Sequence, residues 1–346
     1  MGFEIPPAVA TLLSTPWRNT TFAILPLLFV RHCVLRKPTR PRKVPKIGER
    51  VLVLGASSGV GRTLAKQYVT RGARVCVVGR RKALLDEVKR ECYGTMPSLG
   101  SSSQDVLSIA ADFTKAEDMV KVRALVEREW GGLDTLVVSA GVSALQPLMA
   151  VAGVEVKRGE TMQEASQEGI QRAAEIAGAA VQGNYIGPLV AAVSFVRIFT
   201  PSFVIPTEIP LLSNTSKAPS IVLINSLASV IPAPTRTLYA STKAASLLLY
   251  QALSIEHPNI TFTCVMPSTI EGDFRASAVD SGLVREKDPN KHGLKRDDVA
   301  RRCIRAADYG EKAVFMPATM RFGHLLYWIW PSFVERRAMK KYNFSA

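Results

Sequence analysis

The sequence predicts an α/β fold, a doubly wound parallel sheet with helices on both of its faces. From residue 50 onward, short and nearly continuous apolar runs alternate with amphipathic stretches of helical period. Strands with such runs are buried on both sides, which is typical of a parallel sheet covered by helices. A glycine-rich turn joins the first apolar run to the first amphipathic stretch. With 346 residues, 47% of them hydrophobic, the chain can bury the core of one large domain.

The expected elements follow one another in a regular order. Apolar runs predict strands at 51–55, 74–78, 106–111, 133–138, 220–224, 260–265 and 313–316. Helices are expected between them at 60–71, 82–92, 116–130 and 238–255. Residues 141–220 form a longer, mostly helical stretch with insertions, including a proline-rich loop at 200–217. The strand–helix alternation predicts a single α/β domain from residue 50 onward.

Basic charge gathers at the two ends of the chain. The net charge is +15 overall, +7 within residues 1–50 and +4 within residues 320–346. A nucleic-acid-binding domain would carry a basic stripe on its folded body, so nucleic acid is not an expected partner. Basic residues beside apolar and aromatic segments suit an anionic membrane surface.

Residues 1–49 are expected to be an apolar and basic membrane-associating segment with a linker. The strongly apolar run 22–30 (FAILPLLFV) precedes a proline-broken basic stretch at 36–46. The run is shorter than the ~20 residues that span a bilayer. Whether it crosses a membrane or lies on it stays open, as does an ordinary buried or disordered extension. Positive charge after the run would leave the following domain on the cytosolic side.

Residues 319–346 form an aromatic and basic C-terminal tail of amphipathic character. The stretch 324–333 (HLLYWIWPSF) is followed by four basic residues. Aromatic side chains with adjacent Lys and Arg suit the headgroup boundary of a membrane. The alternative is a tail that docks on the core or on a second copy of the chain.

The five cysteines are odd in number and lack CxxC spacing. Cys76 and Cys264 lie inside apolar runs, which favours small buried hydrophobic residues in a reducing compartment over disulfides or metal ligands. The four histidines show no paired spacing, so no metal site is expected.

The glycine-rich turn GASSGVG (55–61) has the character of a phosphate cradle. Glycines permit a tight turn and close backbone approach, and the amides at a helix N-terminus face a pyrophosphate. A plain strand-to-helix turn is the alternative. The candidate cofactor-binding residues of this turn are Gly55, Ser57, Ser58, Gly59, Val60 and Gly61. Such a turn makes the predicted sheet Rossmann-type.

The second expected strand is followed by Arg80 and Arg81 rather than by an acidic residue. An acid at this position binds the ribose 2′-hydroxyl of NAD. The planar fork of arginine suits the 2′-phosphate of NADP(H) instead. The two arginines therefore predict NADP(H), with simple solvation of a helix start as the alternative.

Residues 50–318 resemble the short-chain dehydrogenase/reductase family in an ordered set of motifs. The nucleotide turn is followed by Asp112, by Ser139-Ala140-Gly141, by Asn184 and by Pro267-Ser268-Thr269-Ile270. Ser226 stands thirteen residues before Tyr239, which opens the motif Tyr239-x-x-x-Lys243. This resemblance implies that the cofactor is also contacted by Asp112, Phe113, Ser139, Tyr239, Lys243 and Ile270.

Three positions depart from the family pattern. Val138-Ser139 stands where the family usually has two asparagines, which changes one contact on the adenosine side. Pro267-Ser268 replaces the usual Pro-Gly, and Gly272 occupies the place of a threonine that often contacts the nicotinamide amide. These differences concern cofactor orientation, and every catalytic group is retained.

The chemistry follows from four side chains. Tyr239 and Lys243 share one face of a helix, and the ammonium favours the phenolate form of the tyrosine. In reduction, Tyr239 donates its proton to the carbonyl oxygen while Ser226 stabilises the charge that develops there. The resemblance further implies that Lys243 holds the nicotinamide ribose and that Asn184 supports a proton-relaying water. Taken singly, Ser226 could be a strand-end cap and Asn184 a turn residue.

The expected function is reversible carbonyl/alcohol redox on a lipophilic molecule such as a steroid, sphingoid base, retinoid or terpenoid. The plan of an apolar N-terminus and a catalytic domain is similar to that of 11β-hydroxysteroid dehydrogenases and 3-ketosphinganine reductases. This similarity favours the endoplasmic reticulum membrane with the catalytic domain in the cytosol, and a homo-oligomer is left open. A broad carbonyl reductase and a non-catalytic NADP(H)-binding scaffold or redox sensor are the alternatives.

Overall fold

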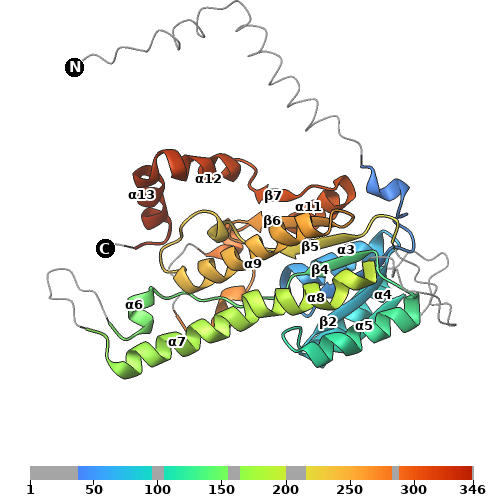
Figure 1. The fold of residues 1–346 in the computed structure, drawn as a ribbon, viewed down its shortest axis with the longest axis horizontal. Coiled ribbons are helices and arrows are strands. Elements are labelled where there is room, and N and C mark those ends of the chain that lie inside the picture. Colours follow the sequence, from blue (N-terminus) through green and yellow to red (C-terminus); the bar gives the residue numbers. More distant parts are fainter. Residues whose placement is uncertain (1–37, 96–104, 155–163, 200–215, 283–287, 345–346) are drawn as a thin grey trace, which may run out of the picture. The chain divides into compact units, whose positions relative to one another are not determined.

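A seven-stranded parallel sheet runs through the centre of the computed structural model, in the order β3-β2-β1-β4-β5-β6-β7 (Figure 1). The strands are β1 (Arg50–Leu54), β2 (Arg74–Gly79), β3 (Val106–Ala110), β4 (Thr135–Val138), β5 (Ser220–Ile224), β6 (Thr261–Pro267) and β7 (Ala313–Met316). All neighbouring strands pair in parallel. The strand order reverses at β1, which has β2 on one side and β4 on the other. Ligands of such sheets bind in the crevice at this switch point.

The structure describes residues 38–95, 105–154, 164–199, 216–282 and 288–344. The chain divides into two units, residues 1–39 and residues 40–346, and the sheet belongs to the second. The predicted apolar run at 22–30 lies outside the described residues, as does most of the expected proline-rich loop at 200–217.

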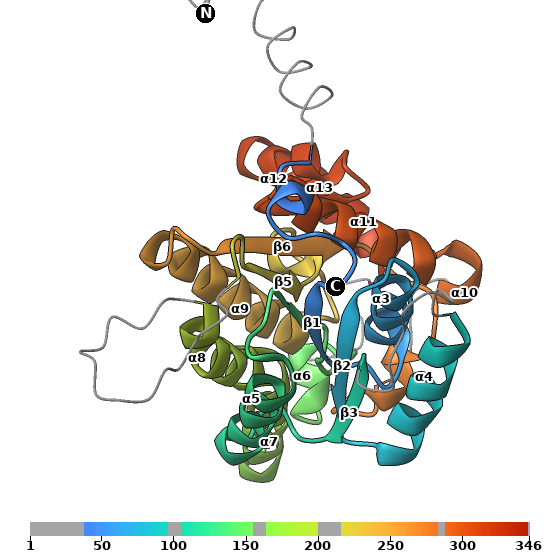
Figure 2. The same ribbon diagram turned by 90° about the vertical axis from the view of Figure 1, so that its right-hand side faces the viewer.

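Two layers of helices cover the two faces of the sheet (Figure 2). One layer contains α3 (Gly59–Thr70), α4 (Lys82–Thr95) and α11 (Arg296–Tyr309). The other contains α5 (Ala116–Trp130), α8 (Gly187–Phe199) and α9 (Thr237–Glu256). The predicted doubly wound α/β fold is therefore confirmed.

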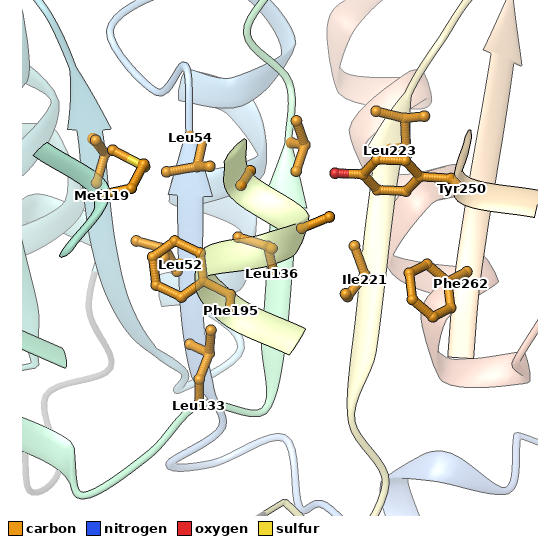
Figure 3. Packing of buried hydrophobic residues seen from close by; sticks show 14 of the residues in the cluster. Leu52, Leu54, Met119, Leu133, Leu136, Phe195, Ile221, Leu223, Tyr250 and Phe262 are labelled. Atoms are coloured by element: carbon orange, nitrogen blue, oxygen red, sulfur yellow. The ribbon is translucent and has the colours of Figure 1, made fainter. Parts of the chain in front are cut away.

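Side chains of each strand alternate between the two layers. In β1, Leu52 and Leu54 belong to the core under α5, α8 and α9, where Figure 3 shows Leu52 beside Phe195. Val51 and Val53 belong to the core under α3, α4 and α11. Because both faces are buried, the strands appear in the sequence as continuous apolar runs.

The stretch between β4 and β5 is mostly helical in the part that the structure describes, as expected. It contains α6 (Leu148–Val151), α7 (Gln167–Val181) and the π-helical turn η2 (Gln182–Ile186), which leads into α8. The continuous helix over Gln167–Val196 is long and apolar enough to cross a membrane, but half of its apolar window is buried within the protein. Its apolar side therefore contributes to the core of the domain.

Short helices complete the second unit. After β5 and β6 come the 3-10 turns η3 (Leu227–Ser229) and η4 (Phe274–Ser277), and α10 (Pro289–His292) precedes α11. Beyond β7 the chain forms two further helices, α12 (Met320–Ile329) and α13 (Pro331–Lys341), which pack on each other (Figure 1). The 3-10 turn η1 (Arg40–Arg42) begins the unit.

Candidate active site

Helix α9 carries Tyr239 and Lys243 one helical turn apart. The Lys243 ammonium nitrogen lies 6.0 Å from the centroid of the Tyr239 ring. Lys243 is buried and donates a hydrogen bond to the carbonyl of Ile224 at 3.1 Å. Burial disfavours the ammonium form and lowers the pKa of Lys243 to about 8. The structure thus places beside the phenol a lysine that can exchange its proton near neutral pH.

Asn184 lies in the π-helical turn η2, where an inserted residue widens the helix. Its Oδ1 accepts the Val142 amide proton at 2.9 Å, and its Nδ2 donates to the Val142 carbonyl at 3.0 Å. The Nδ2 group also donates to Thr242 Oγ1 at 3.1 Å. Turns of this kind are frequent at functional sites. The alternative of an ordinary turn residue does not describe this fully buried side chain, which joins α9 to the segment after β4.

Gly141 marks the point at which Asn184 and Lys243 converge. A Cβ atom at this position would lie 2.8 Å from Asn184 Oδ1 and 3.2 Å from Lys243 Nζ. A residue with a side chain at position 141 would therefore push Asn184 and Lys243 away from the segment that follows β4. Steric contact thus explains why the third residue of the predicted Ser139-Ala140-Gly141 element is a glycine in this chain.

Ser226 follows β5 and begins the 3-10 turn η3. Its hydroxyl oxygen accepts the Ala228 amide proton at 3.2 Å. Ser226 therefore caps the N-terminus of η3. A hydroxyl has one proton to donate and two lone pairs, and the cap uses only one lone pair. Ser226 is half-buried, and its proton stays available for a carbonyl oxygen.

Asn225 is a positioning residue that the sequence analysis did not identify. Its Oδ1 accepts the Ser226 amide proton at 2.8 Å. Its Nδ2 donates to the Lys243 carbonyl at 2.9 Å and to Ser246 Oγ at 3.2 Å. The buried amide thereby fixes Ser226 relative to α9. A polar amide at the end of the apolar run IVLIN was the available signal.

The glycine-rich turn packs directly against the end of β4. A Cβ atom at Gly55 would lie 2.5 Å from the Ala140 nitrogen, and one at Gly61 would lie 2.4 Å from Ser139 Oγ. The Ser139 hydroxyl donates to the Leu54 carbonyl at 2.7 Å. Ser139 therefore braces the turn rather than supplying the amide that the family usually has there. Gly59 and Val60 begin α3, and the amides at a helix N-terminus suit the binding of a pyrophosphate.

Arg81 reaches back to the turn from the start of α4. One of its terminal nitrogens lies 3.1 Å from Ser57 Oγ and 3.1 Å from Ser58 Oγ. Arg80 is exposed at the end of β2, beside Arg81 in the chain. The structure brings two hydroxyls and a guanidinium together, a donor set that suits phosphate oxygens.

The remaining predicted cofactor residues lie at the ends of β3 and β6. Asp112 accepts hydrogen bonds from the Thr114 amide at 3.0 Å and hydroxyl at 2.9 Å through one carboxylate oxygen. The Phe113 ring lies against Gly187, where a Cβ atom would be 2.3 Å from the ring. Ile270 forms an isolated parallel bridge with Leu294. All three follow carboxyl ends of strands, where the sequence placed them.

Two loops form a wall beside Tyr239. The Asp280 carboxylate is buried and accepts the amide protons of Leu145 at 2.6 Å and Gln146 at 2.7 Å. The Phe274 ring meets the Tyr239 ring edge-on, with 6.2 Å between centroids. The segments after β4 and β6 are thus joined. No pattern in the sequence predicted this pairing.

Residues 49–281 match the model of the short chain dehydrogenase family. The chain belongs to this family. It is 28% identical over 290 residues to 11-beta-hydroxysteroid dehydrogenase A of Sesamum indicum, an alignment that covers 81% of this chain and 71% of that protein. It is 38% identical to hydroxysteroid 11-beta-dehydrogenase 1-like protein of Gallus gallus over 100 residues, which cover 29% of this chain and 33% of that protein.

Solved structures share the fold of this short-chain dehydrogenase. An alcohol dehydrogenase from the archaeon Thermococcus sibiricus, in complex with 5-hydroxy-NADP, superposes with a TM-score of 0.56 at 21% identity. The superposition covers 77% of this chain and 94% of that one. Membership in the family makes the chain an oxidoreductase that acts with a nicotinamide cofactor, NAD(H) or NADP(H).

Proposed function

We propose that this short-chain dehydrogenase reduces a ketone or aldehyde on a lipophilic substrate with NADPH. The observation that carries the proposal is the convergence of the Lys243 ammonium and Asn184 at Gly141, with Tyr239 on the same helix and Ser226 fixed to that helix by Asn225. General acid catalysis needs a proton donor, a partner that stabilises its conjugate base and a donor for the oxyanion. Tyr239, Lys243 and Ser226 supply these three.

In the proposed reduction, the proton moves through side chains of this chain and through a water. Tyr239 gives its hydroxyl proton to the carbonyl oxygen of the substrate, and Ser226 donates a hydrogen bond to the same oxygen. The Lys243 ammonium stabilises the resulting phenolate, and its pKa of about 8 suits later proton return. Asn184 orients the segment after β4 beside Lys243 and supports the water that returns the proton. When bound, a nicotinamide cofactor would supply the hydride to the carbonyl carbon.

The residues around the glycine-rich turn fit NADP(H). Arg81 and the hydroxyls of Ser57 and Ser58 would hold the 2′-phosphate, with Arg80 as a second cation. The α3 amides would face the pyrophosphate. Asp112 and Ser139 would line the adenosine side, and Lys243 would hold the nicotinamide ribose.

A lipophilic substrate is supported by the surface beside the catalytic segment. Helix α12 contacts the chain between Ser226 and Tyr239, since His324 Nδ1 lies 2.8 Å from the Val230 carbonyl oxygen. The outward side of α12 exposes Phe322 by 68% and Ile329 by 79%. An apolar surface at this place suits delivery of a substrate from a membrane. On the similarity to 11β-hydroxysteroid dehydrogenases, the proposed location is the endoplasmic reticulum membrane, with the catalytic unit in the cytosol.

The test of the activity is Tyr239→Phe. It removes the proton donor and keeps the ring that packs on Phe274, so turnover should fall about 100-fold or more while the Kd for NADPH stays near that of the unmutated enzyme. NADPH oxidation is measured against a panel of small ketones, steroids, sphingoid ketones, retinal and terpenoid ketones. Tyr309→Phe on α11 is the matched control and should keep full activity. Turnover in Tyr239→Phe above a tenth of the normal rate would contradict the assignment. NADPH binding without turnover of any carbonyl would favour a scaffold or sensor.

A further inference from the structure

A second buried cation lies beside Tyr239. Arg236 is the residue before the first turn of α9 and is only 5% exposed. Its guanidinium carbon lies 5.6 Å from the centroid of the Tyr239 ring, slightly closer than the 6.0 Å of the Lys243 nitrogen. The two cations come from positions three residues before and four residues after the tyrosine. Both positions lie on the helix face of Tyr239.

The backbone before Arg236 is held in an uncommon conformation. Thr235 has a φ of 66° and is buried. A β-branched residue rarely adopts this left-handed region, and such strain persists only where the surroundings fix it. It sets the point at which the chain enters α9 and thereby directs Arg236 inward.

The Arg236 guanidinium is anchored to the wall of the site. Its Nη1 donates to Ser143 Oγ at 2.8 Å and to the Ala144 carbonyl at 3.2 Å. The Ser143 carbonyl in turn accepts the Val279 amide proton at 2.9 Å. One guanidinium therefore connects the start of α9, the loop after β4 and the segment after β6.

We propose that Arg236 is a positioning residue that provides a second, fixed positive charge to Tyr239 and couples that charge to the wall of the substrate pocket. The catalytic consequence rests on the proposed function. The effect on the proton of Tyr239 does not, because it depends on the geometry of the ring and the two cations and not on a substrate.

The charged groups around the ring are few among the described residues. Helix α9 contributes Arg236 and Lys243, and η4 contributes Phe274 with Asp273 and Arg275 on either side of it. Asp273 is exposed, and Arg275 donates to Thr269 Oγ1 at 3.2 Å. The loop after β4 carries no charged side chain at 143–146, and the buried Asp280 is bound to its amides.

The sign of the effect follows from electrostatics. A nearby cation stabilises phenolate relative to phenol. Removing the Arg236 charge should therefore move deprotonation of Tyr239 to higher pH, by about 1 pH unit or more. In the oxidation direction Tyr239 acts as a base, so the rising limb of the rate profile moves to higher pH. In the reduction direction Tyr239 acts as an acid, and the falling limb moves the same way.

The experiment compares Arg236→Met, Arg236→Lys and Ser143→Ala with the unmutated full chain. Tyr239 is titrated through its tyrosinate absorbance, with a matched Tyr239→Phe chain in each background subtracted to remove the other tyrosines. We expect titration at higher pH in Arg236→Met and near-normal titration in Arg236→Lys. Ser143→Ala keeps the charge but loses one anchor and should give a smaller shift. Near-UV circular dichroism and NADPH binding establish that each variant is folded.

Titration of Tyr239 at the normal pH in Arg236→Met would overturn the proposal. If Arg236→Met does not fold, the titrations of Arg236→Lys and Ser143→Ala test the proposal instead. A large upward shift of the Tyr239 titration in Arg236→Lys, which keeps the charge, together with an unchanged titration in Ser143→Ala would contradict a role for charge. A uniform loss of activity with unmoved pH limbs would indicate a structural role only. A shifted titration in a protein that reduces no carbonyl would leave this inference standing and the proposed function wrong.

Discussion

Arg80 and Arg81 both lie exposed after β2, and the side chain of Arg81 reaches the hydroxyls of Ser57 and Ser58. The prediction from the sequence did not distinguish between the two arginines. The structure distinguishes them, because among the described residues Arg81, and not Arg80, forms hydrogen bonds with the glycine-rich turn. The 2′-phosphate of NADPH would therefore depend more strongly on Arg81.

Arg81→Gln should weaken NADPH binding by ~10–100-fold, since hydrogen bonds to a charged group contribute about 1.5–3 kcal/mol. NADH lacks the 2′-phosphate, so its Kd should change little. Arg80→Gln should also weaken the binding of NADPH more than that of NADH, but the loss of NADPH affinity should be smaller than in Arg81→Gln. The measurement is fluorescence titration of each chain with both cofactors.

Lys82→Gln is the control, because it removes a neighbouring exposed charge from the same helix. Its NADPH affinity should stay close to normal. Equal losses for NADPH and NADH in Arg81→Gln, or equal kcat/KM for both cofactors in the unmutated enzyme, would contradict the assignment of the 2′-phosphate site.

The glycine-rich turn and the first turn of α3 lie in close contact with the end of β4. A Cβ atom at Gly61 would lie 2.3 Å from the Gly55 carbonyl oxygen as well as 2.4 Å from Ser139 Oγ. The first turn of α3 therefore has no room to accept a methyl group. The cofactor crevice and the packing of α3 on the sheet depend on the same contact.

Gly61→Ala should lower both stability and NADPH affinity, because α3 must shift away from β4 to relieve the overlap. Overpacking of this kind typically costs about 1–3 kcal/mol, which is measured by urea unfolding. Gly178→Ala in α7 is the matched control, since nothing lies within 4 Å of its added Cβ. It should raise stability by up to about 1 kcal/mol through helix propensity. Equal effects of the two substitutions would refute the close-contact explanation.

The sequence predicted elements better than contacts between elements. Strands such as β5 were predictable because both faces are buried and the run is continuously apolar. The contacts of Asn225 with α9 and of Asp280 with the loop after β4 join segments distant in sequence. They depend on tertiary geometry that no local pattern encodes. The family resemblance predicted Asn184 as a site residue, but it did not predict the π-helical turn in which Asn184 lies.

On the scale of the whole catalytic unit, the candidate active site and a buried ionic cluster occupy opposite ends of the sheet. The candidate active site lies at the carboxyl ends of the strands, as expected for an open parallel sheet. At the amino end, buried Glu49 binds Arg40 at 2.6 Å and also pairs with Arg71. This ionic cluster attaches η1, the start of the unit, to the amino end of the sheet. The candidate active site lies at the opposite end.

The C-terminal helices add a third surface, apolar and basic together. Phe322, Leu325 and Ile329 lie at helical spacing along α12, and Trp328 is 76% exposed. The exposed basic residues of the neighbouring α13 are Arg336, Arg337, Lys340 and Lys341. Clusters of exposed aromatic side chains beside cations are typical of helices that lie in the membrane interface. The sequence predicted this character of the tail, while its division into two helices emerged only from the structure.

Replacement of Phe322, Trp328 and Ile329 by Ser should therefore weaken binding of the full chain to vesicles of phosphatidylserine and phosphatidylcholine. The apolar contribution falls because each buried side chain contributes about 1.5–3 kcal/mol, and the residual attraction through basic residues should decrease further at high salt. Sedimentation with vesicles measures the change, and carbonate extraction of cells measures it in membranes. The matched control replaces Val193, Leu248 and Ile255, which are equally exposed on α8 and α9, and should bind normally. Normal binding by the α12 variant, with loss in the control, would place the membrane contact on the other helices. Protection of the catalytic unit from protease in sealed microsomes would reverse the proposed cytosolic orientation.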